Sequence, residues 1–446
     1  MVGAGISGLT CAYALKKRGV DVLVLEATPH PGGVIRSLSE NGFLFELGPQ
    51  SFMGTDSIFA LCDELGIFSK LIEVPHSAPR YILVDGKLVS VPLSPIAFLF
   101  SSLLGWQTKL SMVADLFRNS SPPEADESVA AFVRAKFTAE LLDRLVGPFV
   151  SGIYAGDAEE LSLRSAFPNI YEAEKISGSV IRGSFRLAKR NRGTRSGRRN
   201  GLCSFQKGNA TLIEALAASL GDSLRFESDV ISEIERDENH FRLKLKEKGH
   251  IEEFRAEKLV LATPAGVNSE LLRKLAPYAT WPLSDIEYAP VIVVSHGYRS
   301  EQIGVDLHGF GFLIPRSSRL NTLGTVWNSS LFPGRAPVGH VLLTSFIGGI
   351  RKPKIHRFSE AEGAEFVRRE VADILKITGN PVVERITEYS RAIPQYNVGH
   401  SKGLDTIRQA VAQVPGLWLT GNYLRGPSIG TCIEHALSVA ESIPIS

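Results

Sequence analysis

Three glycines near the start of the chain, Gly3, Gly5 and Gly8, have the spacing of a phosphate-binding turn. In a strand-turn-helix unit the first glycine permits a tight turn, the second lets the backbone approach a pyrophosphate, and the third lets the helix pack on the strand. Glu26 ends the apolar run that follows, where an acid can accept hydrogen bonds from a ribose. The pattern therefore predicts a dinucleotide site.

The residues before and after this turn indicate the helix and strands that must hold it in place. Residues 9–18 have a helical pattern that stops at Gly19, and residues 20–25 read as a buried strand. Only two residues stand before Gly3, so the strand expected there is nearly absent and its neighbours should lose ladder partners. We therefore expect the true start codon to lie several residues upstream of Met1.

A second glycine pair, Gly32 and Gly33, closely follows Glu26. These glycines would let the backbone pass close to the far side of the cofactor phosphates. FAD is long enough to reach from the first turn to a second domain, so it explains the pair better than NAD does. The chemistry would then belong to the cofactor, and we assign no catalytic side chain.

The composition is typical of a globular protein in a reducing compartment. Of 446 residues 44% are hydrophobic and 22% charged, the net charge is +2, and this length predicts two or three domains. The four cysteines lie far apart and no histidines have ligand spacing, so neither disulfides nor a metal site are expected. The glycine motif leaves no room for a secretory signal. Nucleic acid is not an expected partner, because we interpret the basic stretch 182–199 as a solvated loop rather than a phosphate or lipid contact.

One segment is relevant to membranes. No charged residue occurs between Lys87 and Lys109, and residues 96–106 are strongly apolar. Prolines interrupt the start of this segment, and its apolar part is too short to span a bilayer. Burial as a core helix and insertion into one leaflet both remain open, and Trp106 favours an interfacial edge.

Patterns of a nucleotide domain return in the middle and at the end of the chain. Residues 258–264 and 417–422 each read as a short strand followed by a turn. Residues 56–200 read mainly as helix, and alternating runs within 285–350 predict a separate antiparallel sheet. The interleaving predicts an α/β fold with a discontinuous Rossmann-like FAD-binding domain, an inserted antiparallel-sheet substrate domain and a helical, membrane-associated domain. The expected ranges are 1–55, 205–270 and 390–446 for the first, 56–80 and 271–389 for the second, and 81–204 for the third.

Five further blocks resemble the bacterial type of the oxygen-dependent protoporphyrinogen oxidase family, in matching order along nearly the whole chain. They are Pro148–Asp157, Gly309–Pro315, Phe332–Pro337, Arg391–Tyr396 and Gly421–Gly426. The resemblance implies an FAD enzyme of haem biosynthesis that oxidises protoporphyrinogen IX to protoporphyrin IX, with oxygen as acceptor and hydrogen peroxide as product. It also implies a homodimer. The apolar segment and an apolar substrate lead us to expect a cytoplasmic protein attached peripherally to the inner face of the cell membrane.

The resemblance assigns cofactor contacts to the residues that match the family motifs. These are Gly3, Ala4, Gly5, Ile6, Ser7, Gly8, Glu26, Ala27, Gly33, Leu47, Gly48, Pro49, Val230, Gly421, Asn422, Ser428, Ile429 and Gly430. A helix that begins after Ser428 would point its amides at the electron-accepting end of the flavin. From the residues alone, Val230 would be an ordinary core residue of a strand.

The resemblance also assigns the substrate contacts. Arg80 aligns with a family arginine that pairs with a substrate propionate, a task that suits its planar guanidinium. Leu313, Val326 and Phe346 align with apolar walls around the tetrapyrrole, and Gly152 aligns where backbone approaches it. Without the resemblance, Arg80 would be a surface residue and the three apolar residues would be sheet core.

Three alternatives remain open at this point. The substrate could be coproporphyrinogen III, a choice that depends on how many cationic groups line the pocket. The protein could instead be an amine-oxidase-like or carotenoid-desaturase-like flavoprotein, or a flavin-binding scaffold without turnover. His30 and Pro427 depart from the family pattern, which leaves the redox tuning of the flavin open.

Overall fold

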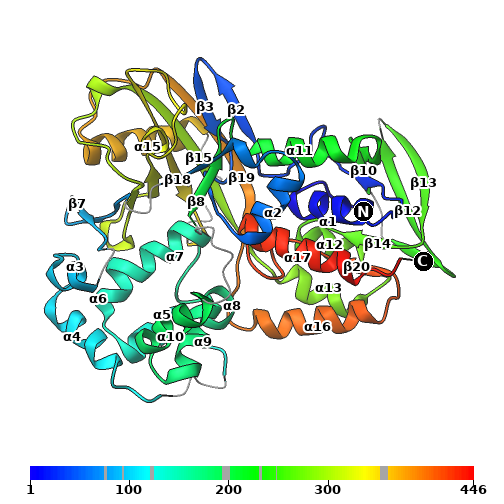
Figure 1. The fold of residues 1–446 in the computed structure, drawn as a ribbon, viewed down its shortest axis with the longest axis horizontal. Coiled ribbons are helices and arrows are strands. Elements are labelled where there is room, and N and C mark those ends of the chain that lie inside the picture. The colour runs from blue at the N-terminus through cyan, green and yellow to red at the C-terminus, as the bar shows by residue number, and fades with distance from the viewer. Residues whose placement is uncertain are drawn as a thin grey trace.

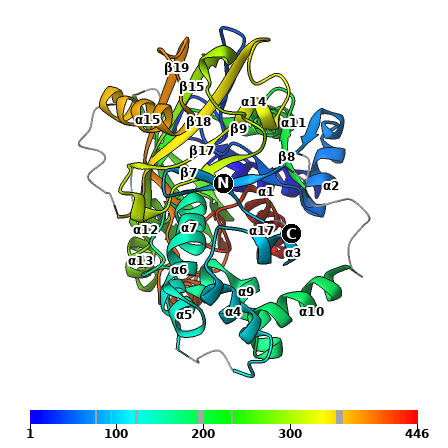
Figure 2. The ribbon, with the colours of Figure 1, turned by 90° about the vertical axis from the view of Figure 1, so that its left-hand side faces the viewer.

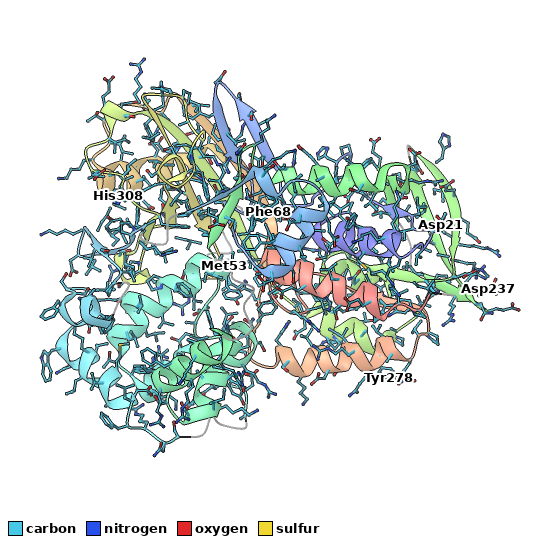
Figure 3. All side chains as sticks on the ribbon, in the orientation of Figure 1. Asp21, Met53, Phe68, Asp237, Tyr278 and His308 are labelled. Atoms are coloured by element: carbon cyan, nitrogen blue, oxygen red, sulfur yellow. The ribbon has the colours of Figure 1, made fainter. Side chains whose placement is uncertain are left out.

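The structure is a computed structural model that describes residues 1–74, 78–92, 95–120, 125–192, 201–230, 234–247, 249–351 and 360–445. The ribbon forms three parts (Figure 1). A nucleotide part lies on the right of Figure 1, a large sheet at the upper left and a group of helices at the lower left. Figure 3 draws the side chains in the same view, in which Met53 lies near the centre.

The nucleotide part is built on a short parallel sheet. Val2 lies in its middle, where its N–H donates to the Val260 carbonyl at 2.9 Å and its carbonyl accepts from the Ala262 N–H at 2.8 Å. On its other side, the Gly3 N–H donates to the Leu25 carbonyl at 2.8 Å. Both neighbouring strands therefore find ladder partners at these positions, contrary to the expectation above. The order is β9 (Leu224–Arg225), β1 (Val24–Leu25), Val2, β14 (Leu259–Leu261) and β20 (Leu417–Leu419).

Helices cover both faces of this sheet, as a parallel sheet requires. Val24 and Val260 face one layer, which consists of α1 (Ile6–Lys17), α2 (Asp56–Glu64), α11 (Ala210–Leu220) and α17 (Ile429–Ser442). Leu25 and Leu261 face the other, which consists of α12 (Ala265–Leu271), α13 (Pro277–Ser284) and α16 (His400–Ala412). An antiparallel ribbon lies at one end, with β10 (Ser228–Val230), β11 (Glu235–Asp237), β12 (His240–Glu247) and β13 (His250–Ala256).

The large sheet has seven strands, paired antiparallel except where β16 and β6 run parallel. Its order is β19 (Val383–Pro394), β15 (Tyr288–Arg299), β18 (His340–Gly348), β17 (Thr322–Val326), β16 (Gly311–Leu313), β6 (Arg80–Val84) and β7 (Lys87–Ser90). Helix α15 (Glu360–Leu375) packs on one face, against Ile292, Val294 and Phe312. The short helix α14 (Asn328–Leu331) follows β17 directly.

The expectation of helix for most of residues 56–200 is wrong in one region. Residues 80–90 form the hairpin of β6 and β7, which adds two strands to the large sheet. Asp85 and Gly86 form its turn with positive φ angles of 49° and 76°, the geometry of a two-residue hairpin turn. A small sheet of β4 (Phe52–Met53), β8 (Leu202–Phe205) and β5 (Leu71–Glu73) and the hairpin of β2 (Ser37–Glu40) and β3 (Phe43–Glu46) complete the strands.

The remaining helices pack together below the large sheet (Figures 1 and 2). They are α3 (Pro95–Phe100), α4 (Trp106–Asp115), α5 (Val129–Lys136), α6 (Ala139–Leu141), α7 (Gly147–Tyr154), α8 (Leu163–Ala166), α9 (Pro168–Ser177) and α10 (Val180–Arg192). The apolar segment 96–106 is divided, because Leu103 and Leu104 are buried while Phe100 and Trp106 are exposed. Within the described ranges, no helix is both long and apolar enough to cross a membrane. Residues 182–192 of the basic stretch lie in α10, so the expectation of a loop is wrong there, and residues 193–199 lie outside the described residues.

Candidate active site

The first glycine motif forms an open cradle at the N terminus of α1. A Cβ on Gly8 would lie 2.0 Å from the Gly3 carbonyl oxygen, so Gly8 is required for the turn itself. A Cβ on Gly5 would meet no heavy atom within 4 Å, and for Gly33 the nearest such atom is the Gly5 Cα at 3.8 Å. The two glycine motifs therefore lie next to each other, joined by the Gly32 N–H that donates to the Ala4 carbonyl at 2.8 Å, with open space beside Gly5.

Backbone amides point into this cradle without partners. Gly5 is the N-cap of α1 and provides no side-chain cap, and the first turn of the helix carries no acidic residue. The first amides of a helix have no intrahelical acceptor, so those of Ile6 and Ser7 are free to bind an anion. The geometry fits a pyrophosphate between Gly5 and Gly33.

Glu26 lies beside the cradle at the end of β1. Its Oε2 accepts from the Ala4 N–H at 2.7 Å, and its Oε1 accepts from the Thr28 N–H at 3.0 Å and the Thr28 hydroxyl at 2.8 Å. The carboxylate thus fixes the glycine turn to the strand end. A ribose contact for Glu26 and Ala27 remains a prediction. Val230 ends β10 and is partly buried against the nucleotide core.

The segment Leu47–Pro49 runs between the nucleotide part and the large sheet. A Cβ on Gly48 would lie 2.0 Å from the Val34 carbonyl oxygen, so this segment packs tightly on the loop of the second glycine pair. The Gly48 carbonyl accepts from Gln50 Nε2 and the Pro49 carbonyl from Asn209 Nδ2, both at 2.8 Å. The side chain of the next residue along the chain and that of Asn209, at the start of α11, therefore hold this piece of backbone in place.

The last glycine block brings a turn and a helix N terminus to the same region. Gly421 has φ 153°, and no described residue accepts a hydrogen bond from the amides of Gly421, Asn422 or Tyr423. Ser428 caps α17 by accepting from the Thr431 N–H at 3.1 Å. The first turn of α17 carries no acidic residue, so its positive end is available to stabilise negative charge.

Two side chains hold the carbonyls of this turn. The Tyr396 hydroxyl donates to the Asn422 carbonyl, and His400 Nε2 lies 3.1 Å from the Tyr423 carbonyl oxygen. Burial lowers the pKa of His400 to about 4, so the imidazole is neutral and donates its Nε2 proton. Tyr396 belongs to a block that carried the family resemblance, but neither residue was assigned a role from sequence.

The predicted substrate residues share one face of the large sheet. Leu313 pairs with Gly324, and Gly324 with Phe346, so both side chains point the same way. Gly311 pairs with both Arg80 and Val326, which places those two residues on the same face. This face is opposite the one that α15 covers. The register thus brings together four residues that are far apart in sequence.

Gly152, in α7, approaches the same face. A Cβ on Gly152 would lie 2.6 Å from Leu313 Cδ2, so the glycine lets α7 pack closely there. The Arg80 guanidinium lies over the Phe310 ring, 5.4 Å from its centroid, and is exposed. The roles of these residues in substrate binding remain predictions.

Tyr389 is a residue of this face that the sequence did not single out. It pairs with Val291 and packs with Phe346 in one apolar cluster. Its hydroxyl is buried and has no hydrogen-bond partner among the described residues. Strand alternation within β19 placed Tyr389 on a face, but only the packing of distant segments reveals the unpaired hydroxyl.

Comparisons with known proteins agree with this site. Residues 6–444 match the family model of flavin-containing amine oxidoreductases. The chain is 34% identical to the chloroplastic protoporphyrinogen oxidase of Nicotiana tabacum over 99% of this chain and 84% of that protein. It is 25% identical to the coproporphyrinogen III oxidase of Bacillus subtilis (strain 168), over 98% of this chain and 95% of that one.

A solved structure shows the same fold. A candidate protoporphyrinogen oxidase from Exiguobacterium sp. 255-15 superimposes with a TM-score of 0.83 at 25% identity, covering 99% of this chain and 97% of that one. The open cradle and the free amides fit FAD, the cofactor of an oxidoreductase in this family. The chain belongs to the flavin-containing amine oxidoreductases and, among them, to the protoporphyrinogen oxidase family.

Proposed function

We propose that the protein oxidises protoporphyrinogen IX to protoporphyrin IX, with oxygen as acceptor and hydrogen peroxide as product. The observation that supports this most is the sheet face on which Arg80 and three apolar side chains lie together. Such a surface suits a flat, apolar macrocycle that carries carboxylates at one edge. When bound, FAD accepts a hydride in each cycle, and loss of six electrons takes three cycles.

We propose the following tasks for the chain itself. The amides of Ile6 and Ser7 bind the pyrophosphate, and Glu26 accepts hydrogen bonds from the ribose. The N terminus of α17 places positive potential where negative charge develops on transfer. Arg80 holds a propionate, while Leu313, Val326 and Phe346 exclude water from the macrocycle.

The charges around the substrate face favour protoporphyrinogen over coproporphyrinogen III. Arg80 forms no ion pair with a described residue. Arg316 and Arg351, which follow β16 and β18, both pair with the buried Asp157, in the first case at 3.2 Å. A substrate with two propionates needs fewer cations than one with four, so the former is favoured where two nearby arginines are already engaged by Asp157.

Turnover of the two porphyrinogens by the purified FAD-loaded protein tests this proposal. Porphyrin fluorescence should rise faster with protoporphyrinogen IX, and one hydrogen peroxide should form per two electrons removed. A strong preference for coproporphyrinogen III would establish the second candidate, which the similarity to the Bacillus subtilis protein supports. Oxidation of amines with no porphyrinogen turnover would contradict both.

We also propose that α3, α4 and α10 form a peripheral membrane contact on the cytoplasmic face. Large apolar side chains are exposed on these helices and the turn after α4: Phe100, Trp106, Leu110, Val113, Phe117 and Phe185. Arg186, Lys189 and Arg190 are exposed on α10 nearby, which suits an anionic lipid surface. Vesicles with anionic lipid should bind the protein, and Phe117→Asp should weaken that binding while leaving porphyrinogen oxidation in detergent unchanged.

The division of the chain into FAD-binding, substrate-binding and helical parts also stays a proposal, with two adjusted ranges. Helix α2 packs in the nucleotide core, so we assign residues 56–64 to the FAD-binding part. Residues 80–90 join the large sheet, so we assign them to the substrate-binding part. A homodimer remains an expectation of the resemblance.

A further inference from the structure

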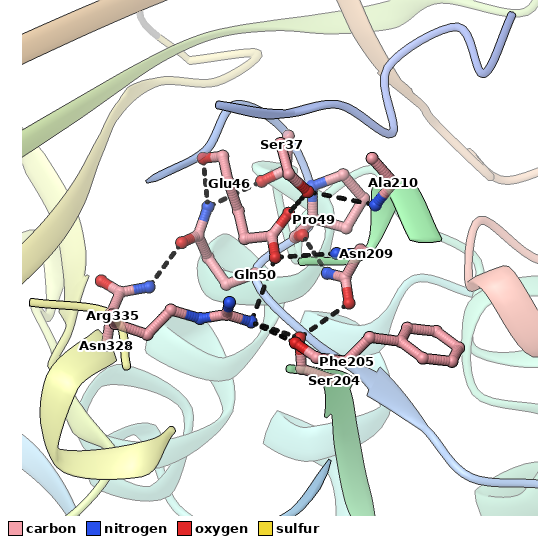
Figure 4. A network of polar contacts seen from close by, with 11 residues as sticks. Ser37, Glu46, Pro49, Gln50, Ser204, Phe205, Asn209, Ala210, Asn328 and Arg335 are labelled. Carbon is pink, nitrogen blue, oxygen red and sulfur yellow. Dashed lines mark hydrogen bonds and ion pairs between the residues drawn. The ribbon is translucent and has the colours of Figure 1, made fainter. Parts of the chain in front are cut away.

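A buried polar network lies where the nucleotide part meets the large sheet (Figure 4). At its centre, Arg335 Nη2 lies 3.2 Å from Glu46 Oε1, and both side chains are almost completely buried. The Glu46 carboxylate also accepts from the Asn209 N–H at 2.9 Å and from the Ser37 hydroxyl at 2.7 Å. Arg335 Nη2 in addition donates to the Ser204 hydroxyl at 2.6 Å. The ion pair thus joins three separate stretches of chain: the hairpin of β2 and β3, residues 204–209, and Arg335.

The network extends to the backbone of the flavin-side segment. Gln50 Nε2 donates to the Gly48 carbonyl at 2.8 Å and to the Glu46 carbonyl at 3.1 Å. Asn209 Nδ2 donates to the Pro49 carbonyl. Because Gln50 is only 6% exposed, water cannot replace these bonds, and the positions of the two carbonyls follow those of the side chains.

The other end of the same glutamine reaches α14, the short helix directly after β17. Gln50 Oε1 accepts from Asn328 Nδ2 at 2.6 Å, and Asn328 is 1% exposed. Asn328 follows Val326, on β17, by two residues. One side chain therefore connects the Gly48 carbonyl to the start of α14, the helix that follows the strand of Val326. Figure 4 shows the contact between Gln50 and Asn328.

We infer that Gln50 and Asn328 are positioning residues, which set the distance between the flavin-side segment Leu47–Pro49 and the substrate strand β17. The buried Glu46 and Arg335 pair anchors this link to the hairpin of β2 and β3 and to the start of α11. This inference rests on the proposed function, because it needs a flavin on one side and a porphyrinogen on the other. Transfer of a hydride depends steeply on such a distance.

Two substitutions separate the two ends of the link. Asn328→Leu removes only the bond between Gln50 and the start of α14, and leaves Gln50 on the Gly48 carbonyl. It should slow anaerobic flavin reduction by protoporphyrinogen IX about tenfold or more, with FAD content, flavin reduction potential and reoxidation by oxygen unchanged. Gln50→Met, of similar length but unable to hydrogen bond, should slow reduction as much and also shift the reduction potential and the visible spectrum of the bound flavin.

A matched control distinguishes positioning from lost stability. His296 is buried in β15 of the same sheet, where its Nε2 lies 2.7 Å from Glu384 Oε2, and it points to the face of α15. His296→Gln should lower the melting temperature while the reduction rate per bound flavin stays within about twofold of the wild-type value. Should Gln50→Met fail to fold, Asn328→Leu decides alone.

Two outcomes would overturn the inference. One is a reduction rate per bound flavin within about twofold of wild type in Asn328→Leu. The other is a rate that falls only in proportion to melting temperature, as in the control. If neither porphyrinogen reduces the wild-type flavin, the proposed function fails. The link between Gln50 and the flavin is then tested by the visible spectrum and reduction potential of Gln50→Met alone. Unchanged values would contradict that link.

Discussion

The proposed cofactor end and the proposed substrate face of this molecule differ in the chemical groups that form them. The cofactor end is mainly backbone, with two glycine motifs that leave open space and two helix N termini with free amides. The substrate face consists of side chains from β6, β16, β17 and β18 that only the sheet register brings together. A main-chain site is local along the chain, whereas a side-chain site depends on the whole fold.

We expect the largest effects from substitutions in the first glycine motif, where Gly8 should affect folding and Gly5 should affect FAD binding. Gly8→Ala would place a methyl group 2.0 Å from the Gly3 carbonyl oxygen, so we expect little folded protein. Gly5 has φ −69°, which alanine accepts, and open space around it. Gly5→Ala should therefore fold normally but bind FAD at least about 100-fold more weakly, because the methyl group occupies the place of the pyrophosphate.

Flavin absorbance after dialysis measures both variants, and the melting temperature of the apoprotein provides the control. If Gly5→Ala retains FAD as tightly as wild type, the cradle is not the phosphate site. The contrast between a cofactor end built from backbone and a substrate face built from side chains would then be wrong.

Arg80→Ala tests the substrate face, because it should weaken substrate binding and leave FAD binding unchanged. A charge-assisted hydrogen bond contributes about 1.5–3 kcal/mol, so KM for protoporphyrinogen IX should rise roughly 10- to 100-fold. FAD affinity should not change, because Arg80 lies on the sheet and not in the cradle. Arg80→Lys should restore part of the loss. Steady-state kinetics at saturating oxygen provide the measurement, and unchanged kinetics in Arg80→Ala would remove this residue from the site.

His400 offers a side chain at the end that backbone otherwise builds. Burial lowers its pKa from 6.5 to about 4, so between these pH values the unfolded chain binds more protons than the native state. The free energy of unfolding therefore rises with pH across this window, by at most about 1.4 kcal/mol per pH unit. This contribution of His400 to stability is lost as the pH falls toward 4.

His400→Gln keeps a donor for the Tyr423 carbonyl without the titrating group, so this part of the pH dependence should disappear. Urea unfolding at pH 4.5 and pH 7 gives the difference. Equal pH slopes in wild type and variant would show that His400 is not the group that titrates.

The smallest expected effect belongs to Tyr389. Its unpaired buried hydroxyl lies on the substrate face, so Tyr389→Phe should change KM or flavin reduction by about three- to fivefold without loss of stability. Tyr298→Phe is the matched control, since Tyr298 is buried in the same sheet on the side of α15. A larger effect in the control than in Tyr389→Phe would show that the face is not distinguished by its hydroxyl.

Features that depend on local backbone geometry could be predicted from sequence. The helix after Gly5, the strand of β14 and the start of α17 near Ile429 appear where the glycines and apolar runs placed them. The hairpin at Asp85 and Gly86 was missed because short helical patterns dominate the surrounding region, although that dipeptide is a turn signal.

Contacts between distant segments could not be predicted in this way. Tyr396 and His400 hold carbonyls of a turn more than twenty residues away, and Gln50 meets Asn328 from the far half of the chain. No periodicity encodes such pairs, since each arises only when the nucleotide part and the large sheet pack together. The predicted substrate residues came from family resemblance for the same reason.

The position of Val2 between β1 and β14, with β20 beyond them, has a consequence for biosynthesis. On the ribosome, β1 and Val2 emerge first, β14 joins only after more than half the chain, and β20 near its end. The parallel sheet cannot close before then, and such late pairing is slow and exposes apolar surface. We therefore expect the glycine turn to lack this support until synthesis is nearly complete, and flavin to bind after translation.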